Sequence, residues 1–457
     1  IRQAIIKMKN WAKIDARRYL SEKRRRKLQK KRLRMLEKHT ARVRAGNYQR
    51  RRATLFGSSS VVAAMLSKHA TTKLEMNQTS LRIVIPQGFS MLQNPEAVIS
   101  LVTAFAKIHR DRAISDVFVD FSKMEIQDLG AHALLCKLVE EIALQAKFQG
   151  ARIAWKGNYP KDPSKNHLIR SMGIIRKLGI ASHYLPYADA QKIHLFERRC
   201  RHEIRALRPK ADIKTDQANA TERFANHVNN CLAKEGLTLT PTARSQLCTY
   251  VAEIIDNAEN HAGMVDWTIQ GYIDTGLEQP ECEIVIFNFG KSIAETLEAL
   301  PFNSYTKANQ VTPYIDMHVK RALFSANWRR CDLMTLIALQ GSVSSKNASI
   351  DSDRGQGTAD LIEFFQNLNR ARHLENRGAA TMYIVSGNTK VVFDGTYEIS
   401  NDGTGPRVIA FNKENDLNLP PDPKSVMPLR GTFFPGTMIG VKFPVQPSDM
   451  QPSEVSK

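Results

Sequence analysis

Three residues that can do chemistry recur at four-residue spacing near the middle of the chain. Glu253, Asn257 and His261 lie in one run without Pro or Gly, and residues at i, i+4 and i+8 share a face of an α-helix. A carboxylate can orient a water molecule as a general base, and an amide oxygen is a neutral ligand that Mg²⁺ accepts beside phosphate oxygens. The pattern favours a nucleotide–metal site, with Glu253 as the base and Asn257 as the metal ligand.

The same stretch must form a helix that buries one side. Its apolar residues recur at helical spacing, which predicts an amphipathic helix packed on a core. These residues are Leu247, Val251, Ile254, Ile255 and Ala258. His261 is interpreted as a residue of the helix end rather than as a participant in the chemistry.

Two glycine-bearing strands follow downstream. Residues 283–290 alternate apolar side chains, include Asn288, and end at Gly290, where backbone can approach a ligand closely. Residues 434–443 begin Phe-Pro-Gly and continue through Thr437 into a late strand. Both strand ends are candidate contacts for a nucleotide.

Between these strands lies a candidate phosphate-binding segment. Ser345 and Lys346 precede Gly355 and Gly357, and this glycine pair opens a new helix. Helix N-termini offer unpaired N–H groups to anions, and a lysine adds a positive charge for a terminal phosphate.

In this order and spacing, the four segments resemble the Bergerat-fold ATPases of the GHKL superfamily, over roughly Thr221 to Pro444. The superfamily comprises gyrase-type, heat-shock chaperone, histidine kinase and mismatch-repair proteins. The resemblance implies an α/β sandwich that binds ATP and Mg²⁺, in which Glu253 activates water and Asn257 holds the metal. The residues that it assigns to the cofactor are Asn257, Asn288, Gly290, Ser345, Lys346, Gly355, Gly357 and Thr437.

The chain departs from the family pattern at two places. Asn288 stands where the family has an aspartate that accepts the adenine amino group, and an amide can accept or donate. Either adenine or a base with a guanine-like carbonyl fits that residue. The third motif ends in Thr358-Ala359 in place of another glycine, which predicts looser phosphate binding.

The region from about Leu81 to Leu185 is similar to the STAS domains of anti-sigma-factor antagonists. Strands predicted at 81–86, 116–121 and 151–157, with a helix at 134–148, indicate an α/β unit. In those antagonists the loop before the helix carries a serine that a partner Bergerat-fold kinase phosphorylates. Leu129 stands at that position here, with Asp128 beside it, so we expect a module that packs or binds a protein partner.

The positive charge is concentrated at the start of the chain. Residues 1–55 contain 21 Lys and Arg against three acidic residues, and so carry +18 of the formal charge of +21. Strong helix formers predict a cationic helical arm that binds nucleic acid through phosphates. Its candidate contacts are Arg17, Arg18, Arg24, Arg25, Arg26, Lys27, Lys30, Lys31 and Arg32. An acidic protein, an anionic membrane surface or a merely solubilising tail are the alternatives.

Composition limits the remaining possibilities. No apolar run approaches the roughly 20 residues of a membrane helix, and the opening segment lacks the pattern of a signal peptide. The cysteines have neither disulfide nor zinc-site spacing, and a reducing cytoplasm is expected. They are Cys136, Cys200, Cys231, Cys248, Cys282 and Cys331.

The predicted fold class is α/β with two domains. It comprises a STAS-like α/β domain, a Bergerat-fold sandwich and a basic helical arm. The predicted ranges are an arm at 1–56, a linker at 57–80, the STAS-like domain at 81–190, a linker helix at 191–220, the nucleotide domain at 221–445 and a disordered tail at 446–457. One or two helices are expected between Leu300 and Ser342, where Lys320, Arg329 and Arg330 are candidate cations. His202 echoes a histidine-kinase phosphoacceptor, but only 55 residues separate it from Asn257, which is short for the hairpin that normally intervenes.

The leading hypothesis is an intracellular Mg-ATP-binding switch, typical of prokaryotes, with slow ATP hydrolysis that controls how the arm or the STAS-like surface engages a partner. One alternative is a nucleotide-binding scaffold subunit of a nucleoprotein complex without catalysis. Another is a serine kinase of a partner-switching system. Signalling, stress response and anti-phage defence are all compatible pathways, and a nucleotide-dependent homodimer is compatible with the family.

Overall fold

The computed structural model describes residues 60–77, 79–110, 114–162, 165–171, 193–200, 212–233, 236–261, 266–277, 279–321, 328–341, 343, 356–373, 380–400, 407–445 and 447–452. By its internal contacts the chain divides into residues 1–58 and 59–457. All described residues belong to the second unit. The predicted arm at 1–56 lies outside them.

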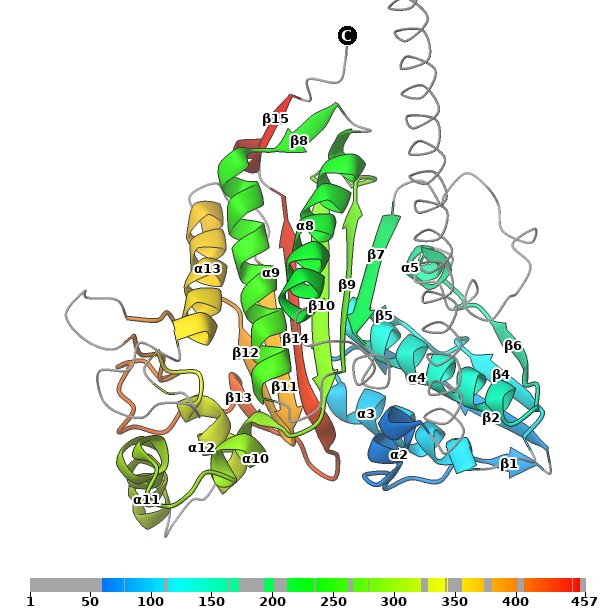
Figure 1. Cartoon of the computed structure of the whole chain (residues 1–457), viewed down its shortest axis with the longest axis horizontal. Coiled ribbons are helices and arrows are strands. Elements are labelled where there is room, and N and C mark those ends of the chain that lie inside the picture. Colours follow the sequence, from blue (N-terminus) through cyan, green and yellow to red (C-terminus); the bar gives the residue numbers. More distant parts are fainter. Residues whose placement is uncertain are drawn as a thin grey trace, which may run out of the picture. The chain divides into compact units, whose positions relative to one another are not determined.

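The amino-terminal part is built on a four-stranded sheet in the order β1-β2-β4-β6 (Figure 1). Its elements are α2 (Val61–Ser67), β1 (Met76–Asn77), β2 (Ser80–Val84), β3 (Gly88–Phe89), α3 (Pro95–Ala106), η1 (Lys107–Arg110), β4 (Asp116–Asp120), β5 (Ile126–Gln127), α4 (Leu129–Phe148), β6 (Ala154–Asn158) and α5 (Asn166–Ser171). Strand β4 pairs in parallel with β2 and with β6. Helices α3 and α4 make the crossovers, as parallel neighbours require. The predicted α/β unit is confirmed.

The carboxy-terminal part is built on a seven-stranded antiparallel sheet in the order β13-β12-β11-β14-β10-β9-β7. Its strands are β7 (Ile193–Cys200), β9 (Trp267–Asp274), β10 (Glu281–Phe289), β11 (Thr381–Gly387), β12 (Thr389–Phe393), β13 (Val426–Pro428) and β14 (Phe434–Pro444). Its helices are α8 (Asp212–Leu232), α9 (Pro241–His261), α10 (Ile293–Glu298), the π-helix η5 (Thr306–Val311), α11 (Thr312–Arg321), α12 (Arg330–Ile337) and α13 (Gln356–His373). Strands β8 (Leu237–Leu239) and β15 (Met450–Pro452), with the turn η7 (Pro447–Asp449) between β14 and β15, form a separate pair.

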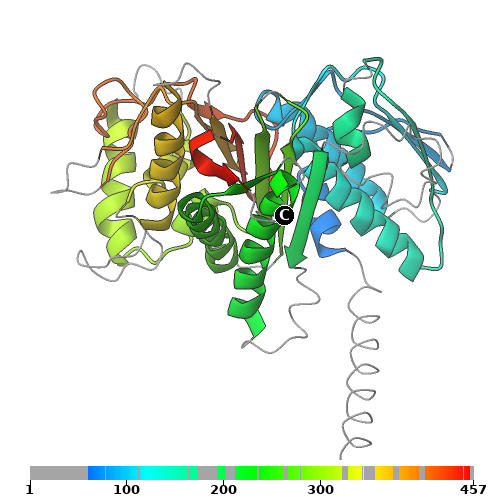
Figure 2. The ribbon, with the colours of Figure 1, turned by 90° about the horizontal axis from the view of Figure 1, so that it is seen from above.

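Both faces of the seven-stranded sheet are covered, and Figure 2 shows the sheet between its two covering layers. On one face, Ile284 and Ile286 of β10 belong to an apolar core shared with α8, α9 and α13. On the other face, Phe287 and Phe289 belong to a core shared with α2, α3 and α4. Successive side chains of a strand point to opposite faces, and the middle of β10, buried on both faces, is accordingly an unbroken apolar run from Ile284 to Phe287.

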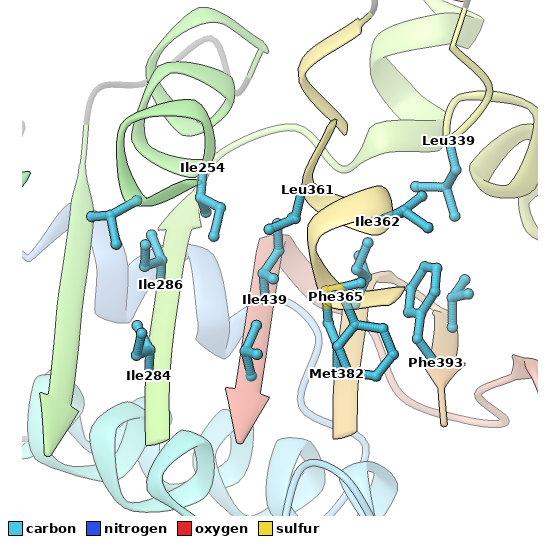
Figure 3. Packing of buried hydrophobic residues seen from close by; sticks show 14 of the residues in the cluster. Ile254, Ile284, Ile286, Leu339, Leu361, Ile362, Phe365, Met382, Phe393 and Ile439 are labelled. Carbon is cyan, nitrogen blue, oxygen red and sulfur yellow. The ribbon is translucent and has the colours of Figure 1, made fainter. Parts of the chain in front are cut away.

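Figure 3 shows the helix-covered face at close range. Ile254 of α9 lies over Ile286, and Leu361 of α13 lies near Ile439 of β14. This packing confirms the predicted amphipathic helix at 247–258. Each fully buried aliphatic side chain contributes about 1.5–3 kcal/mol of burial free energy, which fixes α9 firmly against the sheet.

Three predicted segments differ from the structure. The predicted linker at 57–80 contains α2, whose Val62, Ala63 and Leu66 are fully buried. Of the predicted linker helix at 191–220, residues 193–200 form strand β7, because Leu195 and Phe196 pack into the apolar cores on opposite faces of the sheet, whereas residues 212–220 are helical as part of α8. Of the predicted disordered tail, residues 447–452 form η7 and β15, which pairs with β8.

The mixed α/β class is confirmed, and so are the helices expected in 300–342, as η5, α11 and α12. Helix α4 starts five residues before its predicted start, because Asp128 caps it by accepting from the Ala131 N–H at 2.8 Å. The division into domains at 81–190 and 221–445 stays a prediction, since residues 59–457 form one compact unit.

Candidate functional site

The carboxyl end of β10 brings Asn288 and Thr437 together. The two residues are register partners of the antiparallel β10–β14 pair, and the Thr437 N–H donates to Asn288 Oδ1 at 3.2 Å. Asn288 is buried, at 3% exposure. The side chains of Asn288 and Thr437 point to the face of the sheet that α8, α9 and α13 cover, as do Ile286 and Ile439. Asn288 and Thr437, both assigned to the cofactor by the resemblance, therefore form a polar corner at the edge of an apolar core.

Ser386 completes this corner, and the sequence reasoning missed it. Its Oγ donates to the Gly436 carbonyl at 2.9 Å and lies 2.8 Å from Thr437 Oγ1. It also accepts from the Ile293 N–H at 2.9 Å. A signal was present, since Ser386 directly precedes Gly387 at the end of an apolar strand, a pattern close to the Asn-Phe-Gly of residues 288–290.

Glycines allow the strand ends to approach one another. Gly290 and Gly436 have φ angles of 139° and 135°, values that favour glycine. A Cβ atom on Gly436 would lie 2.0 Å from the Asn288 carbonyl oxygen, and the Gly290 N–H donates to the Pro435 carbonyl at 3.2 Å. The close approach predicted at Gly290 is thus made to the neighbouring strand.

Helix α9 ends beside the corner. The carbonyl of Asp266, which lies only five residues after His261, accepts from the Phe289 N–H at 3.2 Å. Val251, Ile254 and Ile255 are buried on the side that faces the sheet. The side chains of Glu253, Asn257 and His261 lie outside the described residues, although the helix that carries them is described as α9.

The predicted phosphate segment is described only in part. Ser345, Lys346 and Gly355 lie outside the described residues, whereas Gly357 lies in the first turn of α13. The predicted start of a helix at the glycine pair is confirmed. Arg407 ties this helix to the loop before β13, through Asp360 at 2.6 Å and Glu363 at 2.9 Å.

Arg329, a candidate cation in the sequence, has a structural role. It pairs with Asp332 at 3.0 Å and donates to the Leu429 carbonyl at 3.0 Å and to the Asn388 carbonyl. These contacts join α12 to the β11–β12 turn and to the end of β13. Arg330 is half-exposed and lies 3.5 Å from Glu298. Lys320 has no described side chain.

On the opposite face of the sheet, Glu283 holds the start of α4. Its Oε1 accepts from the Leu129 N–H and its Oε2 from the Tyr272 hydroxyl, each at 2.8 Å. Burial, with the nearby charge of Asp128, raises the pKa of Glu283 to about 7. Leu129, at the phosphoacceptor position of the STAS resemblance, is completely buried, so that position is closed in this conformation.

Asp128 and Gly130 complete this junction. Asp128 accepts from the Ser90 hydroxyl at 2.6 Å and from the Leu92 N–H at 2.9 Å, and burial raises its pKa. A Cβ atom on Gly130 would lie 2.0 Å from Tyr383 Oη. Only a glycine lets the first turn of α4 lie this close to β11.

No protein-family model, curated protein or solved structure matches the chain. Within the described part of the chain, no helix is both long and apolar enough to cross a membrane. Among those same residues, no group of three or more His, Cys, Asp or Glu is arranged to hold a metal ion. The arm residues Arg17 to Arg32 and His202 lie outside the described residues.

Proposed function

We propose that the chain is a Mg-ATP-binding switch with slow ATP hydrolysis. One observation carries the proposal: the Asn288–Thr437–Ser386 corner lies on the sheet face covered by α9, at the end where that helix, with Glu253 and Asn257, stops. A base-binding residue, a metal ligand and a general base would then share one edge of the α9 layer. ATP remains the first choice of nucleotide, with a guanine nucleotide as the competitor at Asn288.

Each residue has a proposed role. Asn288, whose amide is oriented by the Thr437 N–H, meets the edge of the base. Asn257 is the protein ligand of Mg²⁺, and that ion neutralises phosphate charge when bound. Glu253 orients the attacking water. Lys346 and the first turn of α13 meet the terminal phosphates.

The switch function rests on what covers the back of the sheet. The strands that end at the corner carry the docked α4 on their other face. A change in these strands on nucleotide closure therefore reaches the STAS-like part directly. We propose that this movement controls engagement of nucleic acid by the arm, or of a protein partner by the STAS-like surface.

The test is phosphate release from Mg-ATP by the full chain and by Glu253→Ala, with and without mixed DNA and RNA. We expect slow release that Glu253→Ala abolishes while nucleotide binding is retained. Binding without release in either protein favours the scaffold alternative. Labelled phosphate on a second protein favours the kinase alternative.

Nucleotide binding is tested by titration of Asn257→Ala. We expect loss of Mg²⁺-dependent binding, whereas Asn260→Ala, a matched asparagine three residues along α9, keeps wild-type affinity. Equal affinity in all three proteins would remove Asn257 from the site. Competition between ATP and GTP in the same titration decides the base.

The nucleic-acid partner is tested by deleting residues 1–55. Each phosphate contact contributes roughly −0.7 to −0.9 to the slope of log affinity against log salt. We expect the deletion to flatten this slope, with single-stranded RNA and duplex DNA compared in parallel. A truncated protein that keeps its slope binds through some other surface.

A further inference from the structure

A polar stripe on α4 is buried where the sequence pattern indicates a solvent-facing side. Lys137, Glu141 and Gln145 are spaced at i, i+4 and i+8 and so share one helix face. Their exposed fractions are only 2%, 2% and 5%. The stripe lies against the start of α2 and the start of β9, so its polar groups meet partners from other segments.

The stripe links two distant points of the chain. The Ser60 hydroxyl donates to Glu141 Oε2 at 2.9 Å, and the Ser60 N–H donates to Gln145 Oε1 at 3.0 Å. Lys137 Nζ lies 3.3 Å from Glu141 Oε1 and 2.9 Å from Asp266 Oδ1. One ammonium group therefore bridges carboxylates from two different segments.

The last link reaches the candidate site. The Asp266 carbonyl accepts from the Phe289 N–H at 3.2 Å, and Phe289 directly follows Asn288. The series Ser60, Glu141, Lys137, Asp266 and Phe289, called the Lys137 relay below, is continuous. It joins the first residues after the 1–58 unit to the end of β10.

Buried ion pairs add little net free energy to the stability of a fold. Desolvation of the charges offsets most of the attraction, and replacing the whole set with apolar groups of similar size is often neutral or stabilising. Removing only one partner is strongly destabilising, because it leaves a buried charge unpaired. A buried ammonium shared by two carboxylates fixes the relative positions of α4 and the start of β9, since displacing either acid leaves a charge unpaired.

We propose that Lys137 couples the nucleotide site to the chain that enters at Ser60. The proposal rests on the function proposed above. Displacement of Ser60, when nucleic acid engages the arm, changes the hydrogen bonding of Glu141 and shifts Lys137 between its two acids. Asp266 then moves with the end of β10, and Asn288 with it. Binding of nucleotide displaces the same residues in the reverse order.

The test replaces the relay as a whole, so that no buried charge is stranded. The relay variant carries Lys137→Met, Glu141→Leu and Asp266→Asn in the full chain. The matched control carries Lys156→Met and Asp116→Asn, which removes the exposed ion pair between β6 and β4. Circular dichroism establishes that both variants fold.

The first readout is the nucleotide dissociation constant with and without a saturating 20-nucleotide single strand. We expect the oligonucleotide to change wild-type nucleotide affinity by fivefold or more, and nucleotide to change oligonucleotide affinity by the same factor. In the relay variant both factors fall below twofold, while each ligand alone binds as in wild type. The control keeps the wild-type factors. A relay variant that also keeps them overturns the proposal.

The second readout does not need nucleotide. Hydrogen exchange of the peptide that contains the Phe289 amide should change when oligonucleotide is added to wild type or to the control, and should not change in the relay variant. If wild type binds no nucleotide, the proposed function fails, and this exchange result still decides the relay. An unchanged Phe289 peptide in wild type rules out the link.

Discussion

The two faces of the seven-stranded sheet are covered by different chemistry. Under α8, α9 and α13 the inward side chains of β9, β10, β11 and β14 are apolar along most of their length, and polar groups gather at the strand ends, at Asn288, Ser386 and Thr437. Under α4 the same strands present Glu283, Tyr272 and Gln270 in the middle of the buried area.

This difference means that the two faces hold their helices by different interactions. An apolar face holds α9 against the sheet and confines the hydrogen-bonding groups to the strand ends. A face with buried titratable groups makes the docking of α4 depend on pairing and protonation, because each such group must keep its partner. The sheet thus has one face held by apolar packing and one face whose packing depends on buried charges.

The largest effect is expected from truncating two adjacent side chains of β10 that point to opposite faces of the sheet. Ile286 and Phe287 are adjacent in β10, and each is 1% exposed. We expect Ile286→Ala and Phe287→Ala each to destabilise the fold by about 4 kcal/mol. Denaturant unfolding followed by far-ultraviolet circular dichroism and by tryptophan fluorescence should give one shared transition in both variants. Two transitions in Phe287→Ala would mean that the α4 face folds independently.

Breaking one buried charge pair should have the next largest effect. Lys137→Met alone strands Glu141 and Asp266 without their shared cation, which should cost about 3 kcal/mol. Lys156→Met removes an exposed partner of Asp116 and should change the unfolding midpoint far less. The paired measurement is urea unfolding at one pH. Equal effects would mean that the Lys137 charges are solvated.

The pH dependence sharpens the contrast further. Unfolded Glu283 loses its proton near its ordinary pKa of 4.5, whereas folded Glu283 keeps it up to about 7. Between these values the folded state binds more protons, so the free energy of unfolding falls as pH rises, by up to ~3 kcal/mol, and is flat above pH 7. Glu283→Gln should lose this decline in urea unfolding at pH 5 and pH 8. Superimposable profiles would assign the decline to another group, such as Asp128, whose pKa is also raised.

The smallest expected stability change is at the strand-end corner. Thr437→Val keeps the side-chain shape but removes the hydroxyl that contacts Ser386 Oγ, and should cost about 1 kcal/mol. Nucleotide affinity should fall nonetheless, because the corner is held by that contact. Thermal unfolding and nucleotide titration of the same sample separate the two effects. Lowered stability with unchanged affinity would make the corner purely structural.

Most of the elements around the candidate site were predictable from the sequence. The spacing of Val251, Ile254 and Ile255 predicted α9, and the glycine at 357 predicted the start of α13. The pairing of Asn288 with Thr437 was seen only in the structure, because sequence periodicity carries no information about which strands become neighbours.

The second face of the sheet was not predictable in the same way. Lys137, Glu141 and Glu283 are charged, and charged residues are almost never fully buried unless paired. Their partners come from segments far away in the sequence. Strand β7 was missed for a related reason. Its charged residues are typical of a solvated linker helix, but in the structure Glu197 and Arg199 pair with each other at 2.7 Å.

The pairing of β15 with β8 determines the order in which segments of this protein can fold during translation. The Asp449 carbonyl accepts from the Thr240 N–H at 2.8 Å, one residue before α9 begins, although the two residues are about 200 positions apart. During synthesis on the ribosome, α9 emerges long before the strand that anchors its first turn. We therefore expect the helix that carries Glu253 and Asn257 to reach its final placement only after residues 449–452 have been translated.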